Sequence, residues 1–184
     1  FNQIVQTRYA EEIERVEPEK IQAGIRRDQE RRLSFITDEI IRQNKGPFLE
    51  YMVVKYIKFE SKRKNRPPLR DLLENAPENA EFVPYQNVGG VHFNLPAGYH
   101  RQFDLLARAT EDKDPSPVIE CKCQEKPVGT AEVEYFALKI KDLRSEIPNL
   151  LPIIYSESGF TAPAERKMKE SGISWSRPDL WDLS

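Results

Sequence analysis

The chain has 184 residues, of which 39% are hydrophobic and 10% aromatic, which is enough apolar bulk for one folded domain and too much for a disordered, solvating chain. Lys plus Arg (28) nearly balance Asp plus Glu (30), so the overall charge excludes a uniformly basic surface and leaves only local clusters to consider. The longest apolar stretches, such as residues 150–155, fall far short of the roughly 20 residues of a membrane helix, which predicts no membrane partner.

Residues 1–45 are dense in charge, with apolar residues at partly helical spacing that Pro18 interrupts. This pattern predicts a helical extension, or a linker from a missing upstream module, ahead of a domain at residues 46–184. The chain starts at Phe1 and no targeting segment follows, so we expect a piece of a longer protein. A fused upstream regulatory module or homo-oligomerisation is the expected partnership.

Gly46-Pro47 predicts the start of a helix, because proline has no N–H to lose in the first turn. The apolar residues that follow recur at one, three and four positions and form a stripe that a sheet would bury. These residues are Phe48, Leu49, Met52, Val53, Tyr56 and Ile57. Glu50 lies at the edge of the stripe.

A basic cluster follows, in which seven basic residues between Lys55 and Arg70 meet a single acid, Glu60. Such clusters can contact phosphate groups, so Lys62, Arg63 and Lys64 are candidate nucleic-acid contacts. A solvated helix end that stops at Pro67-Pro68 explains the same pattern equally well. No aromatic interleaving that would indicate base stacking is expected in this stretch.

The rest of the chain alternates between strand and helix patterns. Strands are predicted at residues 82–88, 91–95, 102–109, 118–124, 150–156 and 173–176, with a Gly89-Gly90 turn between the first two and a loop at 110–117. Helices are predicted at residues 130–147 and after Thr161, which is a suitable N-cap. This order predicts an α/β fold, with a mixed central sheet and helices on both faces.

Chemistry-bearing residues cluster on the predicted strands. Side chains alternate along a strand, so Glu120 and Lys122 share one face while Cys121 and Cys123 share the other. If the 102–109 and 118–124 segments pair as a hairpin, Asp104 joins Glu120 and Lys122 at an open edge of the sheet. Carboxylate oxygens are the ligands that Mg²⁺ prefers. A lysine beside them can hold or deprotonate an attacking water and offset the charge of a phosphate oxygen.

Asp104, fifteen intervening residues and Glu120-Cys121-Lys122 resemble the Asp…Glu-x-Lys signature of the PD-(D/E)XK nuclease superfamily. Residues 46–50, Gly-Pro-Phe-Leu-Glu, are similar to the helix that brings an additional acid in Mrr-like restriction endonucleases and Holliday junction resolvases. Residues 158–164 and 171–173 are similar to the strand, turn, helix and strand that close the core in that branch. The resemblance covers about residues 46–183.

The resemblance implies a restriction-endonuclease-like core and a metal-dependent endonuclease that acts on DNA, with RNA not excluded, and leaves a 5′-phosphate and a 3′-hydroxyl. It implies that Asp104, Glu120 and the backbone carbonyl of Cys121 bind Mg²⁺, for which Mn²⁺ substitutes. Lys122 would be the catalytic lysine and Glu50 an auxiliary acid.

The sequence departs from the family pattern at two positions. Phe103 replaces the proline of the superfamily's name, which leaves the carboxylate available. Ala131 breaks the Gln-x-x-x-Tyr motif of RecB-like exonucleases, which disfavours that subfamily.

Simpler interpretations of the same residues remain open. An ion pair between Lys122 and Glu120 at the sheet edge explains the motif without chemistry. His100 and Gln124 alternate in phase with the site residues, so each is either a phosphate contact or a plain surface residue. Four potential zinc ligands, Cys121, Cys123, His92 and His100, match no common zinc spacing. Burial as small apolar side chains accounts better for both cysteines.

Two other functions compete with the nuclease. One is a nuclease fold that binds nucleic acid without cutting it, and the other is a structural or oligomerisation domain driven by residues 1–45. Intact Asp104, Glu120 and Lys122 favour the enzyme. Because two cysteines one residue apart form no disulfide framework, an intracellular, cytoplasmic location is expected.

Overall fold

The computed structural model describes residues 45–64, 66–94 and 100–181, except for the side chains of residues 92–94, 100 and 101. The helices predicted within residues 1–44 lie outside the described residues. Residues Leu49–Asp182 form one compact unit, which carries the fold and the candidate site. Among the described residues, none of the helices combines the length and apolarity that a bilayer crossing requires.

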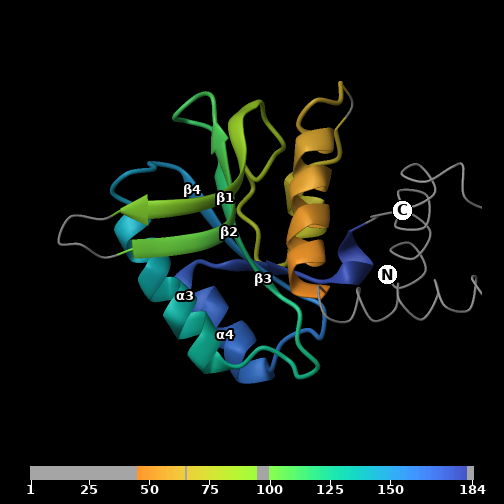
Figure 1. The fold of residues 1–184 in the computed structure, drawn as a ribbon, viewed down its shortest axis with the longest axis vertical. Coiled ribbons are helices and arrows are strands. Elements are labelled where there is room, and N and C mark those ends of the chain that lie inside the picture. Colours follow the sequence, from red (N-terminus) through yellow and green to blue (C-terminus); the bar gives the residue numbers. More distant parts are fainter. Residues whose placement is uncertain (1–44, 65, 95–99, 182–184) are drawn as a thin grey trace, which may run out of the picture. The chain divides into compact units, whose positions relative to one another are not determined.

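The described chain alternates short helices with the strands of a single sheet. A helix covers residues 45–60. It is followed by η1 (Leu69–Leu72), β1 (Tyr85–Asn94), β2 (His100–Ala109), β3 (Ser116–Lys122), α3 (Thr130–Leu143), β4 (Leu150–Ser156), α4 (Ala162–Ser171), β5 (Ser174–Ser176) and η2 (Pro178–Leu180). The strands lie in the order β1-β2-β3-β4-β5 (Figure 1). Pairing is antiparallel from β1 to β3 and parallel from β3 to β5.

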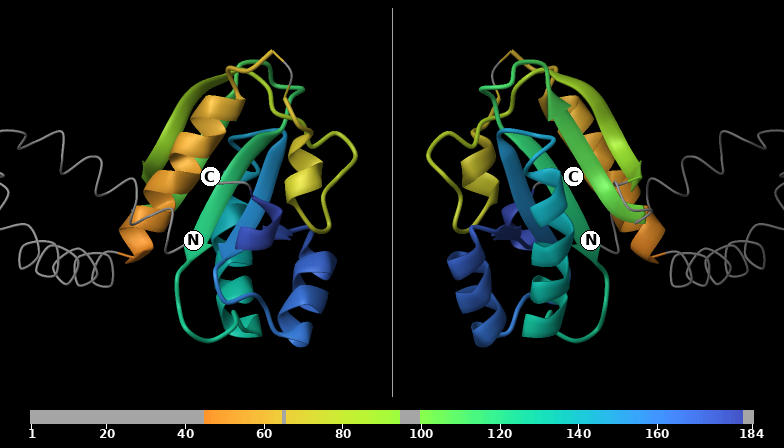
Figure 2. Two further views of the ribbon diagram at one scale, coloured as in Figure 1. Left: turned by 90° about the vertical axis from the view of Figure 1, so that its right-hand side faces the viewer. Right: turned by 90° about the vertical axis from the view of Figure 1, so that its left-hand side faces the viewer.

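Helices cover both faces of this sheet. The 45–60 helix lies across one face, and α3 and α4 lie side by side on the other (Figure 2). The core beneath α3 and α4 includes Phe103, Leu106, Val118, Phe136, Ile154 and Met168. On β4, six of seven positions are buried, as expected of a strand covered on both faces. The predicted α/β fold, a mixed sheet flanked by helices, is therefore confirmed.

The two strands predicted on either side of a Gly89-Gly90 turn are one continuous strand, β1, so that prediction is wrong. Pairing with β2 continues through the glycines with a register shift between Gly89 and Val91, which leaves Asp104 and Leu105 of β2 opposite Gly90 alone. This is a β-bulge. A Cβ at Gly90 would lie 3.3 Å from the backbone oxygen of Asp104, so glycine permits the close approach of the two strands.

Helix ends differ from the predictions by a few residues, while one cap agrees. Lys45 is already helical, so the helix does not begin at Gly46-Pro47. The predicted end of α3 at residue 147 is also wrong, because the helix stops at Leu143 and a turn then buries Ile147. Because the apolar spacing continues through that turn to Ile147, the sequence pattern does not show where the helix ends. Thr161 caps α4 as predicted, its hydroxyl oxygen accepting the N–H of Ala164.

Candidate active site

The two central antiparallel strands separate where the candidate residues lie. The register pairs Leu105 with Ile119. Beyond that pair, the N–H of Cys121 donates to Oδ2 of Asp104 over 2.7 Å, so a side-chain carboxylate takes the place of a backbone acceptor. The bulge in β2 adjoins this point, and bulges commonly re-aim a side chain next to a functional site. Asp104 thus reaches the strand segment that carries Glu120 and Lys122.

This site is not at a sheet edge. β3 is the third of five strands, so the expectation that the site lies at an open edge is wrong. The recorded ladder pairs of β2 and β3 end at Leu105 and Ile119, and Asp104 lies directly beyond that pair.

Two lysines bind the carboxylate of Glu120 from different elements. Nζ of Lys122 donates to Oε1 over 3.0 Å, and Nζ of Lys139, on α3, donates to Oε2 over 2.6 Å. Glu120 and Lys139 are 7% and 6% exposed, whereas the Lys122 side chain is 27% exposed. The shared face predicted for Glu120 and Lys122 is observed. The ion pair expected from the non-catalytic interpretation is also present.

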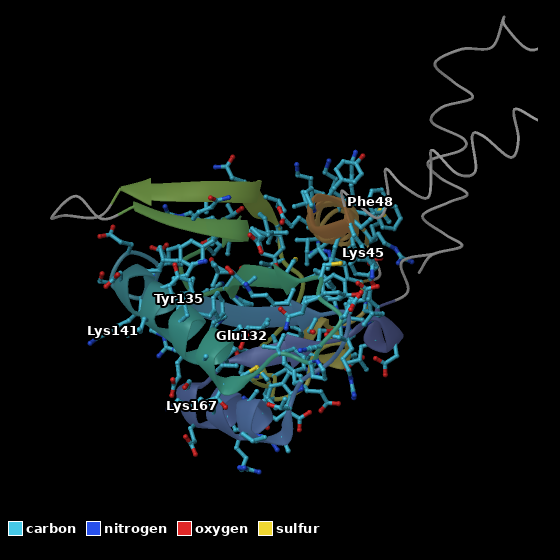
Figure 3. All side chains as sticks on the ribbon, turned by 60° about the horizontal axis from the view of Figure 1, so that its bottom comes forward. Lys45, Phe48, Glu132, Tyr135, Lys141 and Lys167 are labelled. Atoms are coloured by element: carbon cyan, nitrogen blue, oxygen red, sulfur yellow. The ribbon has the colours of Figure 1, made fainter. Side chains whose placement is uncertain are left out.

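Sequence reasoning missed Lys139. Its ammonium group lies 4.7 Å from the ring centroid of Phe103 and 5.8 Å from that of Tyr135. Figure 3 shows Tyr135 on α3. A signal was present, because Lys139 falls three residues after Phe136 and four before Leu143, on the buried face of the helix. A lysine at a core position requires a buried partner.

Glu50 belongs to the 45–60 helix, which lies on the face of the sheet opposite to α3 and α4 (Figure 2). It is half-buried on the 45–60 helix. Burial first, and then the negative charges of Asp104 and Glu120, raise the pKa of its carboxyl, while Lys122 opposes the shift. Burial and the charge of Glu120 likewise raise the pKa of Asp104, against the hydrogen bond from Cys121. Three carboxylates from three elements therefore interact electrostatically around Lys122.

The chemistry of this donor set fits a hard divalent cation. Carboxylate oxygens suit Mg²⁺, and a cation would relieve the carboxylate repulsion that adds to burial in raising the pKa values of Glu50 and Asp104. Within the described part of the chain, however, no group of three or more His, Cys, Asp or Glu side chains is arranged to hold a metal. The oxygens of Glu120 face Lys122 and Lys139, so an ion would have to share Glu120 with them.

The cysteines are less suited to zinc. Burial, and then the charges of Asp104 and Glu50, raise the pKa of the Cys121 thiol well above its usual value. The thiolate is the form that binds metals, and this environment disfavours it. Sγ of Cys123 lies 2.9 Å from a carboxylate oxygen of Glu157. The two candidate histidines have side chains outside the described part.

The candidate nucleic-acid contacts are dispersed. Lys62 and Lys64 are exposed, while Arg63 pairs with the buried carboxylate of Glu60 over 2.9 Å. Nε2 of Gln124 donates to the carbonyl of Lys126 within its own loop. The side chain of His100 is outside the described part. The expectation of no interleaved aromatic residues is wrong, because the exposed ring of Phe59 lies 5.6 Å from the Arg63 guanidinium.

The chain was compared with family models, curated proteins and solved structures. No family model and no curated protein matches the chain. Similar solved structures include the protein of unknown function AF1548 (TM-score 0.43, 19% identity, 51% of this chain and 50% of that one). They also include a repair endonuclease from Pyrococcus abyssi (TM-score 0.37, 14% identity, 50% and 38%) and a complex of EndoMS with double-stranded DNA (TM-score 0.37, 15% identity, 50% and 36%). This chain spans half or less of the length of each.

Proposed function

We propose that residues 46–184 form a metal-dependent endonuclease domain that hydrolyses phosphodiester bonds in DNA, with Mg²⁺ as the metal and Mn²⁺ as a substitute. The observation that carries the proposal is the gathering of Glu50, Asp104 and Glu120 around Lys122 where β2 and β3 separate. One surface ion pair needs a single acid and a single base. Three partly or fully buried acids around a partly exposed lysine match what metal-assisted phosphate hydrolysis requires.

Each residue has a distinct role in this proposal. Asp104, Glu120 and the Cys121 carbonyl would hold the metal, with Glu50 as an auxiliary acid. When bound, Mg²⁺ supplies charge stabilisation to the phosphate. Lys122 is the more exposed of the two lysines. As an ammonium group it can balance charge on a phosphate oxygen, and once it has released a proton its neutral amine can accept one from an attacking water.

Two substitutions separate metal binding from chemistry. Asp104→Asn removes a charged oxygen, so both Mg²⁺ affinity, measured by calorimetry, and plasmid cleavage should fall. Lys122→Ala removes no ligand and takes a positive charge from beside the site. Its Mg²⁺ affinity should persist or rise while turnover falls about 10²- to 10⁴-fold, as for the loss of acid–base catalysis.

A surface ion pair provides the matched control. Nζ of Lys167, on α4, lies 3.8 Å from Glu134, and Figure 3 shows Lys167 away from the 45–60 helix. Lys167→Ala should change neither Mg²⁺ affinity nor cleavage. If Lys122→Ala instead unfolds the domain and abolishes metal binding, the ion pair is structural. Parental cleavage by both site variants would refute the assignment.

A nucleic-acid-binding domain that does not cut is the second candidate. The observation in its favour is that both oxygens of Glu120 already bind ammonium groups, at 3.0 and 2.6 Å. Under this alternative the parent would bind DNA with a salt-dependent affinity. It would show no Mg²⁺-dependent or Mn²⁺-dependent cleavage of plasmid or single-stranded DNA.

A further inference from the structure

The outward side of the 45–60 helix carries aromatic rings alternating with cations. Leu49, Val53 and Ile57 are fully buried on the inward side. On the outward side, Tyr51 is 53% exposed and Phe59 is 62% exposed. Positions four residues apart lie on one face of a helix, and the exposed side chains of this face and of the turn after it are Tyr51, Lys55, Lys58, Phe59, Lys62 and Arg63. We refer to these six residues as the aromatic–basic face.

The rings and cations of this face contact one another. Nζ of Lys55 lies 5.2 Å from the ring centroid of Tyr51, and the Arg63 guanidinium lies 5.6 Å from that of Phe59. Arg63 is itself held by the buried carboxylate of Glu60 over 2.9 Å. Glu60 is the only acid between residues 51 and 64 and is turned inward, so the exposed charges of the face are all positive.

This chemistry matches an unpaired polynucleotide better than it matches a duplex. Single-stranded nucleic acids bind where cations follow the phosphates and aromatic side chains stack on successive bases. Paired bases in a duplex hide their faces within the helix stack, so duplex binding would use the lysines and leave the rings idle. Tyr51 and Phe59 are separated by about 12 Å along the helix axis, enough for two stacking positions.

We propose that the aromatic–basic face binds single-stranded DNA, with bases on Tyr51 and Phe59 and phosphates on Lys55, Lys58 and Lys62. Tyr51 follows Glu50 directly in the chain, so one end of the face lies level with the candidate site along the helix axis. This deepens the proposed function and rests on it for the choice of DNA and for the fate of the bound strand. Binding itself depends only on the face.

The test measures binding without cleavage. Fluorescence anisotropy of labelled oligo-dT, and of a duplex of equal length, is titrated with the full chain in EDTA at several salt concentrations. Phe59→Ala and Tyr51→Ala should each weaken oligo-dT binding by about 5- to 150-fold, the range for removal of a stacked ring. Duplex affinity and the salt slope should be unchanged. Phe59→Trp should restore binding and Phe59→Leu should not.

Substitution of a cation of the face should change the salt dependence of oligo-dT binding, unlike substitution of a ring. Lys62→Ala should weaken oligo-dT binding and reduce its dependence on log salt concentration by about 0.7 for each phosphate that the protein no longer neutralises. The control for an exposed apolar side chain is Leu138→Ala on α3. Leu138 is 64% exposed and lies within α3. This variant should bind oligo-dT like the parent.

Several results would overturn the proposal. Bases do not stack on Phe59 if Phe59→Ala binds oligo-dT like the parent. The same holds if the variant loses affinity for oligo-dT and for the duplex equally. If Phe59→Ala binds oligo-dT like the parent but has a different oligomeric state in size-exclusion chromatography, the face is a contact between copies of the chain. Tighter binding of oligo-U than of oligo-dT would make RNA the ligand. Failure of the proposed function has a separate signature, parental cleavage by Lys122→Ala, and leaves these binding results standing.

Discussion

At Glu120, one carboxylate binds two lysines whose surroundings differ. Lys122 comes from the same strand and is partly exposed, whereas Lys139 crosses from α3 and is buried beneath the ring of Phe103. Taking an ammonium group out of water is costly unless it is paired and hydrogen-bonded. The short 2.6 Å contact with Glu120 supplies that partner. Lys139 therefore holds Glu120 from the side of α3, and Lys122 is the more accessible of the two amines.

Lys139→Met tests this division between the lysines. The substitution keeps the length of the side chain and removes the ammonium group, so the free energy of unfolding should fall by about 1.5–3 kcal/mol, typical of a hydrogen bond to a charged group. Urea denaturation gives the value. Lys141→Met, at an exposed position of the same helix, should change stability by less than about 0.5 kcal/mol. Equal changes in both variants would mean that the buried pair contributes no net stability.

At the scale of elements, the β1–β2 pair sets the position of Asp104. The bulge opposite Gly90 gives β2 one extra residue, and this breaks the alternation that would place Phe103 and Leu105 on one face. Phe103 and Leu106 instead share the core beneath α3 and α4. The sequence predicts Asp104 beside Glu120 from alternation alone, but the bulge determines the local path of the strand.

Adjacent glycines allow a matched test of the bulge. Gly90→Ala would place a Cβ 3.3 Å from the Asp104 backbone oxygen, which forces β2 to shift by a few tenths of an ångström. Cleavage should fall, by at most about 10²-fold, the loss that a 1 Å misplacement can cause. Gly89→Ala meets no atom within 4 Å and should cut DNA at the parental rate. Equal activity in both variants would show that the bulge does not position Asp104.

At the scale of the whole molecule, the site concentrates negative charge from helix, hairpin and central strand. Glu50 and Asp104 both have raised pKa values, caused first by burial and then by neighbouring carboxylates. The folded protein therefore binds these protons more tightly than the unfolded chain does. Stability consequently falls as pH rises from the ordinary pKa values through the raised ones, and the loss is complete above them.

Asp104→Asn should remove the part of this pH-dependent loss of stability that the ionisation of Asp104 causes. In EDTA, the variant should gain stability relative to the parent as pH rises from about 4 towards 8, because the parent ionises Asp104 beside Glu120 and the variant does not. Urea denaturation across this range measures the difference. Asp112→Asn, at an exposed position in the β2–β3 loop, is the control for loss of a carboxylate outside the site. A variant whose relative stability declined with rising pH would contradict the raised pKa.

The sequence by itself determined the features that depend on a few neighbouring residues. Strand alternation put Glu120 and Lys122 on one face, Thr161 marked a helix cap, and the order of elements indicated a mixed sheet with helices on both faces. The roles of Asp104, Glu50 and Lys122 in catalysis stay predictions. Such features follow from the backbone geometry of a short segment and do not depend on which distant segments pack against it.

The tertiary structure decided which distant elements meet. It brought Lys139 of α3 to Glu120 and placed β3 in the middle of the sheet. It put the two glycines inside the continuous strand β1, opposite a bulge in β2. It also left Tyr51 and Phe59 exposed among cations on the outward side of a helix whose other side is buried. No local pattern specifies these outcomes, because burial and side-chain pairing also depend on contacts between residues that are far apart in sequence.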